Sequence, residues 1–472
     1  MESSEFIGTI KLITSNKKLG NKQFSFPKYN QRFRNQISKS NSQFGSVKIF
    51  LVIIVIGWFS SLFIGFTPVL TFFNILGLIF AAVGLKNKKL GLLGIAFLCT
   101  LDAMTRSFLL TGGLWRWNTL NYWLILVMLL NIPLLLKIND KQTRLLQIFI
   151  VLMIIMLSIS LDFTDGVQSI LNTVTIFGIM IYFIKTIKEK ETWYWTGIIC
   201  GVTAAVGGAV FYFQIASLPY INPNSFSHFP LTAMFAICLA IPVANQIKQG
   251  RFLLLLLLIV NLVWVILSGS RGSMLTGFIC LIYFVIIMRS LSWTTGLIIV
   301  CLIALYWSSN ILIDQQVYAL HRIQKLFDQS ITLDERTSGR SDLFWTGWQI
   351  FINQPLGLGT GSFEEGANFL NIIGGKDRPA HSAWNMVLAE NGFMGFLLLF
   401  AWVVSFVIKG IFNSSGDDFS VGLLVTLVLG ISFVSKEFQG KDLWYLAAGA
   451  MVQLNAKSIN EMFDQAPYLF GV

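Results

Sequence analysis

The chain has 472 residues, of which 55% are hydrophobic and only 12% are charged, and its mean hydropathy is +0.69. This composition leaves too little polar surface to cover a soluble protein of this length, so it predicts a membrane protein. The formal charge of +11 could indicate nucleic acid binding, but the basic residues are spread among short loops and an N-terminal tail, so we expect no nucleic acid partner.

The first 48 residues are polar and basic. Nine lysines and arginines stand against two glutamates in this stretch. The basic residues are too dispersed, and the first apolar stretch begins too late, for a cleavable signal peptide. We interpret residues 1–48 as a cytoplasmic tail that touches anionic lipid headgroups.

Apolar stretches of about 18 residues recur from Ile49 onward, and most are long enough to cross a bilayer as a helix. Helices satisfy their own backbone hydrogen bonds, so they are the economical way to cross lipid. The expected fold is an all-α polytopic membrane protein with about 12–14 transmembrane helices. The expected spans cover residues 49–66, 69–85, 90–110, 120–136, 145–161, 169–184, 194–216, 229–247, 252–267, 273–288, 293–309, 393–408, 419–434 and 443–454.

Lysine and arginine residues indicate the orientation of these spans. With the N-terminus in the cytoplasm, every second connection carries basic residues, from Lys86 to Lys409, as the positive-inside rule requires. This alternation predicts two cytoplasmic tails, two sets of transmembrane helices and one long periplasmic loop. In chain order these parts are the tail 1–48, the helices 49–309, the loop 310–392, the helices 393–454 and the tail 455–472.

The long loop is predicted to contain short helices. Apolar residues at helical spacing over 311–327 predict a helix that lies on the membrane surface. A second helix is predicted to start near Ser341 and to stop before Pro355, and the glycines that follow favour a tight turn. The segment after His381, up to Glu390, is predicted to be a short helix that leads into the next span.

Arginines on the periplasmic side are the first candidates for an anion site. Arg271 lies between two spans, where it either extends its side chain to the lipid headgroups or binds an anion. Its small glycine and serine neighbours leave room for an anion. Arg336 and Arg340 flank a short link in the loop, and guanidinium groups match phosphate geometry, although exposed arginines are also ordinary in long loops. Arg378 is a further candidate for substrate binding in the same loop.

Four other residues complete the candidates. His381 ends the loop, and a histidine there is either structural or suited to exchange a proton with a substrate. Asp102 and Arg106 lie four residues apart on one helical face, which favours an internal ion pair, and Arg106 can also lend charge to a site. Asn224 follows a proline, and turn formation is enough to explain an asparagine at this position. The alternative is that its side chain binds a sugar or a phosphate.

The second half of the chain carries an ordered set of short motifs. They are Gly339-Arg340-Ser341-Asp342 with Trp345, then Asn353-Gln354-Pro355-Leu356-Gly357-Leu358-Gly359, Ser362-Phe363, Ala380-His381-Ser382-Ala383-Trp384 and Glu390-Asn391-Gly392. Together with residues 222–224 and 268–272, this set resembles the signature of the bacterial O-antigen ligase and O-antigen polymerase family. Each motif is weak alone, but their order is specific.

The resemblance implies a polytopic inner-membrane glycosyltransferase of the C-type fold class, with its active site on the periplasmic face. It implies transfer of a glycan from an undecaprenyl-pyrophosphate carrier to a hydroxyl of a lipid, glycan or protein acceptor, without cofactor or metal. In that family, arginines matching Arg271 and Arg340 are associated with the donor pyrophosphate, and a histidine matching His381 with the acceptor. Many members carry asparagine where this chain has Ser382.

The chemistry of these residues agrees with such a reaction. Breaking a bond between a sugar and pyrophosphate develops negative charge on the leaving group, which arginines stabilise without a metal, and direct attack would invert the anomeric centre. A flippase for lipid-linked oligosaccharides is the rival from another class, but it needs charges along its spans, and these spans are almost free of charges. Transfer onto serine or threonine of a protein is a second rival.

Overall fold

The computed structural model describes residues 47–60, 62–63, 66–83, 87, 90–91, 93–94, 96–98, 100–101, 141–186, 190–215, 223–247, 250–268, 270–288, 330, 340–370, 380, 382–413, 416–435, 447, 449–451 and 454. These residues form helices and turns, with no strand among them, which confirms the all-α prediction. The chain divides into two compact units, Met1–Ile53 and Ile54–Val472. All labelled helices belong to the second unit.

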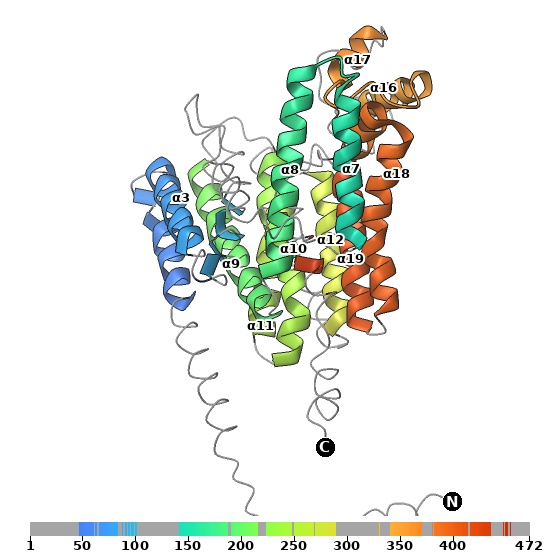
Figure 1. The fold of residues 1–472 in the computed structure, drawn as a ribbon. Helices are drawn as coiled ribbons and strands as arrows, with labels where there is room; N and C mark the ends of the chain where they lie inside the picture. The colour runs from blue at the N-terminus through green and yellow to red at the C-terminus, as the bar shows by residue number, and fades with distance from the viewer. Residues whose placement is uncertain are drawn as a thin grey trace, which may run out of the picture. The chain divides into compact units, whose positions relative to one another are not determined.

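Most labelled helices overlap the expected spans in chain order, and α16 and α17 fall within the expected loop (Figure 1). They are α3 (Phe66–Val83), α7 (Lys141–Leu157), α8 (Phe163–Thr186), α9 (Lys190–Ile215), α10 (Pro223–Ile247), α11 (Arg251–Leu267), α12 (Arg271–Met288), α16 (Arg340–Asn353), α17 (Phe363–Phe369), α18 (Ala383–Phe412) and α19 (Gly416–Ser435). The expected spans over 120–136 and 293–309, and the surface helix over 311–327, lie outside the described residues.

Helix α10 begins two turns earlier than expected. Its first residue is Pro223, and proline suits the first helical position because the missing N–H would have no partner there anyway. Asn224 was expected in a turn and is the second residue of this helix. At its other end, α10 is separated from α11 by Gly250, which has a φ of +71° and stands just before the first residue of α11.

Small residues let the helices of the bundle approach closely. A Cβ on Gly197 of α9 would lie 2.9 Å from the carbonyl oxygen of Ala236 in α10, so these two helices pack with their backbones nearly in contact. Helix α10 also packs against α11 and α12. Helix α12 packs against α19, α19 against α18, and α18 against α7 (Figure 1).

Several helices show the length and surface of membrane-spanning elements. Within the described residues, Thr192–Val210 and Ala383–Phe412 are long and apolar enough to cross a bilayer, and shorter apolar helices accompany them. Helices α7 and α18 also expose large apolar side chains, as lipid-facing helices do, whereas soluble proteins rarely expose so much apolar surface. These side chains include Ile148, Val151, Ile154, Ile155, Phe393, Met394, Leu397 and Phe400. The total number of spans and their orientation stay predictions.

Helices α16 and α18 agree with the sequence prediction in type and place. Helix α16 was expected from near Ser341 and runs from Arg340 to Asn353. Helix α18 contains both the short helix expected after His381 and the span that follows, with a kink between them at Gly392, whose φ is +64°. The seven-residue helix α17 was not predicted.

Candidate functional site

The N-terminal ends of α10 and α12 lie against each other. The hydroxyl groups of Ser227 and Ser273 are both buried and share a hydrogen bond of 2.7 Å. Ser227 stands one turn after Asn224, and Ser273 stands two residues after Arg271, so two candidate positions belong to neighbouring helix ends. The first turn of a helix has free N–H groups and the positive end of the helix dipole, which together favour an anion.

Serine hydroxyl groups shape the short link between α11 and α12. Ser268 donates to the carbonyl oxygen of Val265 at 2.6 Å and accepts from the backbone N–H of Ser270 at 3.2 Å. Ser270 donates in turn to the hydroxyl of Ser273 at 3.1 Å, in the first turn of α12. Hydrogen bonds among Ser268, Ser270 and Ser273 therefore connect the end of α11 to the first turn of α12, which begins at Arg271.

The start of α16 is fixed to the start of α18. The Nδ2 group of Asn385 donates to the carbonyl oxygen of Leu343 at 2.6 Å. Gly347 lies so close to the same amide that a Cβ there would overlap it. In the sequence, Arg340 stands three residues before Leu343, and His381 stands four residues before Asn385. The contact therefore joins the two helices that follow these candidates in the chain.

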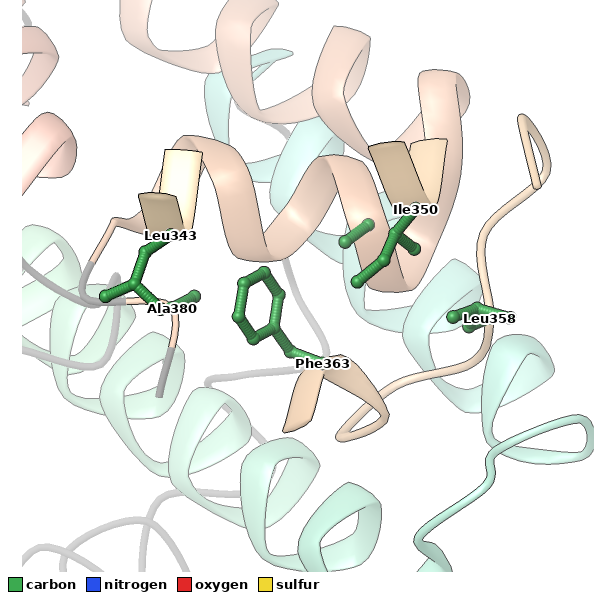
Figure 2. Close-up of a cluster of buried hydrophobic side chains, with 6 residues drawn as sticks. Leu343, Ile350, Leu358, Phe363 and Ala380 are labelled. Carbon is green, nitrogen blue, oxygen red and sulfur yellow. The ribbon is translucent and has the colours of Figure 1, made fainter. Parts of the chain in front are cut away.

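A buried apolar cluster joins α16, α17, α18 and the residue before His381 (Figure 2). Its members are Leu343, Ile350, Leu358, Phe363, Ala380 and Ala389. In Figure 2 the ring of Phe363, from α17, points toward α16 between Leu343 and Ile350. Because Ala380 belongs to this cluster, the chain is anchored immediately before His381.

The residue after His381 is anchored as well. Ser382 is the N-cap of α18, and its hydroxyl accepts from the backbone N–H of Asn385 at 3.4 Å. The same hydroxyl donates to the carbonyl oxygen of Phe433 in α19 at 3.1 Å. Ser382 thus ties the start of α18 to α19.

Residues 355–362 form a glycine strap against the kink of α18. Gly357, Gly359 and Gly361 have φ values of 93°, 101° and 83°, a conformation that favours glycine. The N–H of Gly359 donates to the carbonyl oxygen of Glu390 at 2.9 Å, and the N–H of Gly361 donates to the Glu390 carboxylate at 2.9 Å. The expected tight turn is confirmed.

The opposite side of the glycine strap contacts α7 and the turn between α7 and α8. Ser160 in this turn donates to the carbonyl oxygen of Thr360 at 2.8 Å. The Thr360 hydroxyl donates to the carbonyl oxygen of Met153 in α7 at 2.9 Å and accepts from Nδ2 of Asn391 in α18 at 2.9 Å. Thr360 therefore bridges α7 and α18.

Glu390 was expected only as part of a motif, and the structure gives it a distinct role. It is 4% exposed and is the only charged side chain among the buried residues of the described part of the chain. Asn385 and Thr360, which make the contacts above, were not singled out from the sequence as functional. The available signal was a polar residue inside an otherwise apolar stretch, which indicates a buried hydrogen-bonded group.

The structure describes the candidate residues only in part. It describes no candidate side chain. It gives the backbone of three candidates, each in the first turn of a helix, namely Asn224, Arg271 and Arg340. The other candidates lie wholly outside the described residues, namely Arg106, Arg336, Arg378 and His381. No group of three potential metal ligands occurs among the described residues, and the metal-free mechanism stays a prediction.

Residues 252–400 match the family model described as O-antigen ligase. The matched segment contains five candidates, namely Arg271, Arg336, Arg340, Arg378 and His381. A search of curated proteins found none that matches the chain. The match spans the link before α12, the helices α16 and α17, the glycine strap and the kink of α18. The partners of these parts in α7, α10 and α19 lie outside it. Over residues 252–400 the chain is therefore similar to the O-antigen ligase family, whose members are membrane-integral and work with lipid-linked glycans.

Proposed function

We propose that this chain is a glycosyltransferase that moves a glycan from an undecaprenyl-pyrophosphate carrier to an acceptor hydroxyl at the periplasmic face of the inner membrane. The observation that carries the proposal is the O-antigen ligase match, since it spans Arg271, Arg340 and His381. Ligation of a finished glycan and polymerisation of repeat units both use this bond chemistry.

Arg271 and Arg340 are proposed to hold the donor pyrophosphate. Each is the first residue of a helix, so the free N–H groups and the dipole of that helix add to the guanidinium charge. Cations held in this way stabilise the negative charge that develops on the departing phosphate oxygen, which makes a metal unnecessary. Four further residues are proposed as additional substrate contacts, namely Arg106, Asn224, Arg336 and Arg378.

His381 is proposed to accept the proton of the acceptor hydroxyl or to orient that hydroxyl. The acceptor oxygen forms a bond to the anomeric carbon of the donor sugar as the bond from that carbon to the pyrophosphate oxygen breaks. The electron pair leaves with the pyrophosphate, the proton goes to the imidazole, and the anomeric centre inverts. The neighbours of His381 in the sequence, Ala380 and Ser382, are both held by contacts in the described part of the chain.

The test uses purified full-length protein in detergent, a lipid-linked glycan and an acceptor lipid. Arg271→Ala, Arg340→Ala and His381→Ala are each expected to abolish the covalent product while leaving membrane insertion intact. Arg144→Ala is the matched control, because Arg144 is exposed on α7 and lies outside the matched segment. Normal product from all three variants would contradict the proposal, and a flippase would make no covalent product in this assay even with the unaltered chain.

The acceptor class and the metal requirement are tested with the same assay. A core lipid, a growing glycan and a serine-rich peptide are offered in parallel, and the labelled product identifies the acceptor. Transfer is expected to continue in the presence of EDTA, because the arginines neutralise the leaving group. Loss of transfer in EDTA and recovery with Mg²⁺ would overturn the metal-free mechanism.

A further inference from the structure

Helix α16 carries three distinct stripes of side chains along its length. The first is buried against α17 and α18 and consists of Leu343, Thr346, Gly347 and Ile350. The second is polar and at least partly exposed, and consists of Asp342, Gln349 and Asn353. The third is large, apolar and exposed, and consists of Phe344, Trp345, Trp348 and Ile352. We call this third stripe the aromatic face.

The aromatic face is too exposed to be part of the protein interior. Phe344 and Trp345 are each 56% exposed, Ile352 is 58% exposed, and Trp348 is 39% exposed. At 100° per residue these four side chains lie within an arc of about 100° around the helix axis. No charged residue lies between them on this face. Exposed apolar patches of this kind usually mark an interaction site.

The helix cannot bury this face by turning toward α18. The bond from Asn385 Nδ2 to the carbonyl oxygen of Leu343, at 2.6 Å, fixes its rotation at one end. Gly347 is in direct contact with the same amide, and Ile350 is completely buried in the apolar cluster (Figure 2). The aromatic face is therefore held outward by the packing of the buried stripe.

The aromatic face continues into the apolar surface of a membrane-spanning helix. After α16 ends, the chain reaches Leu356, which is 80% exposed. The neighbouring residue, Pro355, accepts a hydrogen bond of 3.1 Å from the N–H of Phe393, the first residue after the kink of α18. From there α18 exposes Phe393, Met394 and Phe400, side chains that a helix of this length and hydropathy presents to lipid.

We propose that the aromatic face of α16 binds the membrane interface, with its rings at the boundary between headgroups and acyl chains. Two tryptophans, an adjoining polar stripe and continuity with a lipid-facing helix are the features of an interfacial amphipathic helix. The bilayer would hold α16, and with it the glycine strap, at the level of the headgroups. This interaction goes beyond glycan transfer and does not depend on it.

The test measures membrane depth along α16 in the full-length chain. Single cysteines replace Trp345, Trp348 and Ile352 on the aromatic face, and Gln349 on the polar stripe as the matched control. The described native cysteines, Cys200, Cys238 and Cys280, are buried and stay in place, and Cys99 and Cys301 are replaced by alanine. Each protein is labelled with a nitroxide and reconstituted in vesicles of phosphatidylethanolamine and phosphatidylglycerol.

Collision of the label with oxygen, which concentrates in lipid, and with a water-soluble nickel chelate is then measured by electron paramagnetic resonance. We expect oxygen to dominate severalfold at positions 345, 348 and 352 and nickel to dominate at position 349. Equal access of nickel to all four positions would overturn the proposal, as would shielding of the aromatic face from both reagents, which would indicate a protein partner. Position 352 keeps the test decisive if loss of a tryptophan prevents folding, because that variant retains both indole rings.

Discussion

Glu390 is a buried carboxylate in α18, and its Oε2 accepts a hydrogen bond from the N–H of Gly361 at 2.9 Å. Glu390→Ala would leave that N–H without its partner in the interior, and losing a hydrogen bond to a charged group costs about 2–3 kcal/mol. We expect a lower Tm in detergent and reduced glycan transfer, with a smaller effect for Glu390→Gln, which keeps an acceptor oxygen. Glu365→Ala, on the exposed side of α17, is the control. Equal Tm values for Glu390→Ala and Glu365→Ala would show that the buried bond is unimportant.

At the scale of the helices, the buried bond between Ser227 and Ser273 holds the starts of α10 and α12 together at 2.7 Å. Ser227→Ala should cost about 1 kcal/mol of stability and should raise the KM for the lipid-linked donor, because the two helix ends would no longer be aligned. The KM for the acceptor should stay unchanged. Thr276→Val is the control, since the Thr276 hydroxyl bonds to Gly272 within its own helix.

The double variant makes this prediction sharper. If Ser227 and Ser273 act through their shared bond, Ser227→Ala and Ser273→Ala together should raise the donor KM no more than either change alone. Additive effects would mean that the two serines act separately, and the bond would then not explain the donor KM.

The kink of α18 depends on a backbone conformation that only glycine adopts easily. Gly392 has a φ of +64°, and a Cβ there would overlap the backbone of Leu356 and lie 2.5 Å from the carbonyl oxygen of Pro355. Gly392→Ala should therefore displace the glycine strap, destabilise the protein by more than about 1 kcal/mol and impair transfer. Thermal unfolding and the transfer assay measure these effects.

The matched control for the kink is Gly430→Ala in α19. Nothing lies within 4 Å of a Cβ at this position, and Gly430 stands inside a helix, so alanine should be neutral or stabilising by up to about 1 kcal/mol. The Gly430 carbonyl oxygen that accepts from Trp384 Nε1 at 2.9 Å is retained in the variant. A similar loss for both glycine variants would contradict a special role for the kink.

At the scale of the whole molecule, the basic connections predict which helix ends face the cytoplasm. Helix α7 has 17 residues and a length of about 26 Å, close to the thickness of the hydrocarbon core. Ser158 and Lys141 are both exposed, near opposite ends of α7. In Ser158→Cys, the cysteine should react with a membrane-impermeant maleimide that has entered the periplasm of intact cells. In Lys141→Cys, the cysteine should react only after the inner membrane is opened. Labelling of Lys141→Cys before that step would reverse the proposed orientation.

The sequence by itself determined the helical fold class, the approximate bounds of α7 to α12, and the presence of α16. Hydropathy suffices for these features because a segment in lipid must satisfy its backbone hydrogen bonds internally, so a long apolar stretch has one regular conformation open to it. The motifs of residues 339–392 also indicated the resemblance to the O-antigen ligase family, because their order can be read from the sequence without any knowledge of contacts.

Only the tertiary structure decided how those motifs meet. The bond from Ser160 to Thr360 joins residues 200 positions apart, and the Ser227 and Ser273 hydroxyls are 46 positions apart. Local patterns carry no information on such pairs, because a buried polar group takes whichever partner the packing of distant helices brings within reach. For the same reason, Glu390 looks like an ordinary helix residue in the sequence and becomes a buried anchor of the glycine strap in the fold.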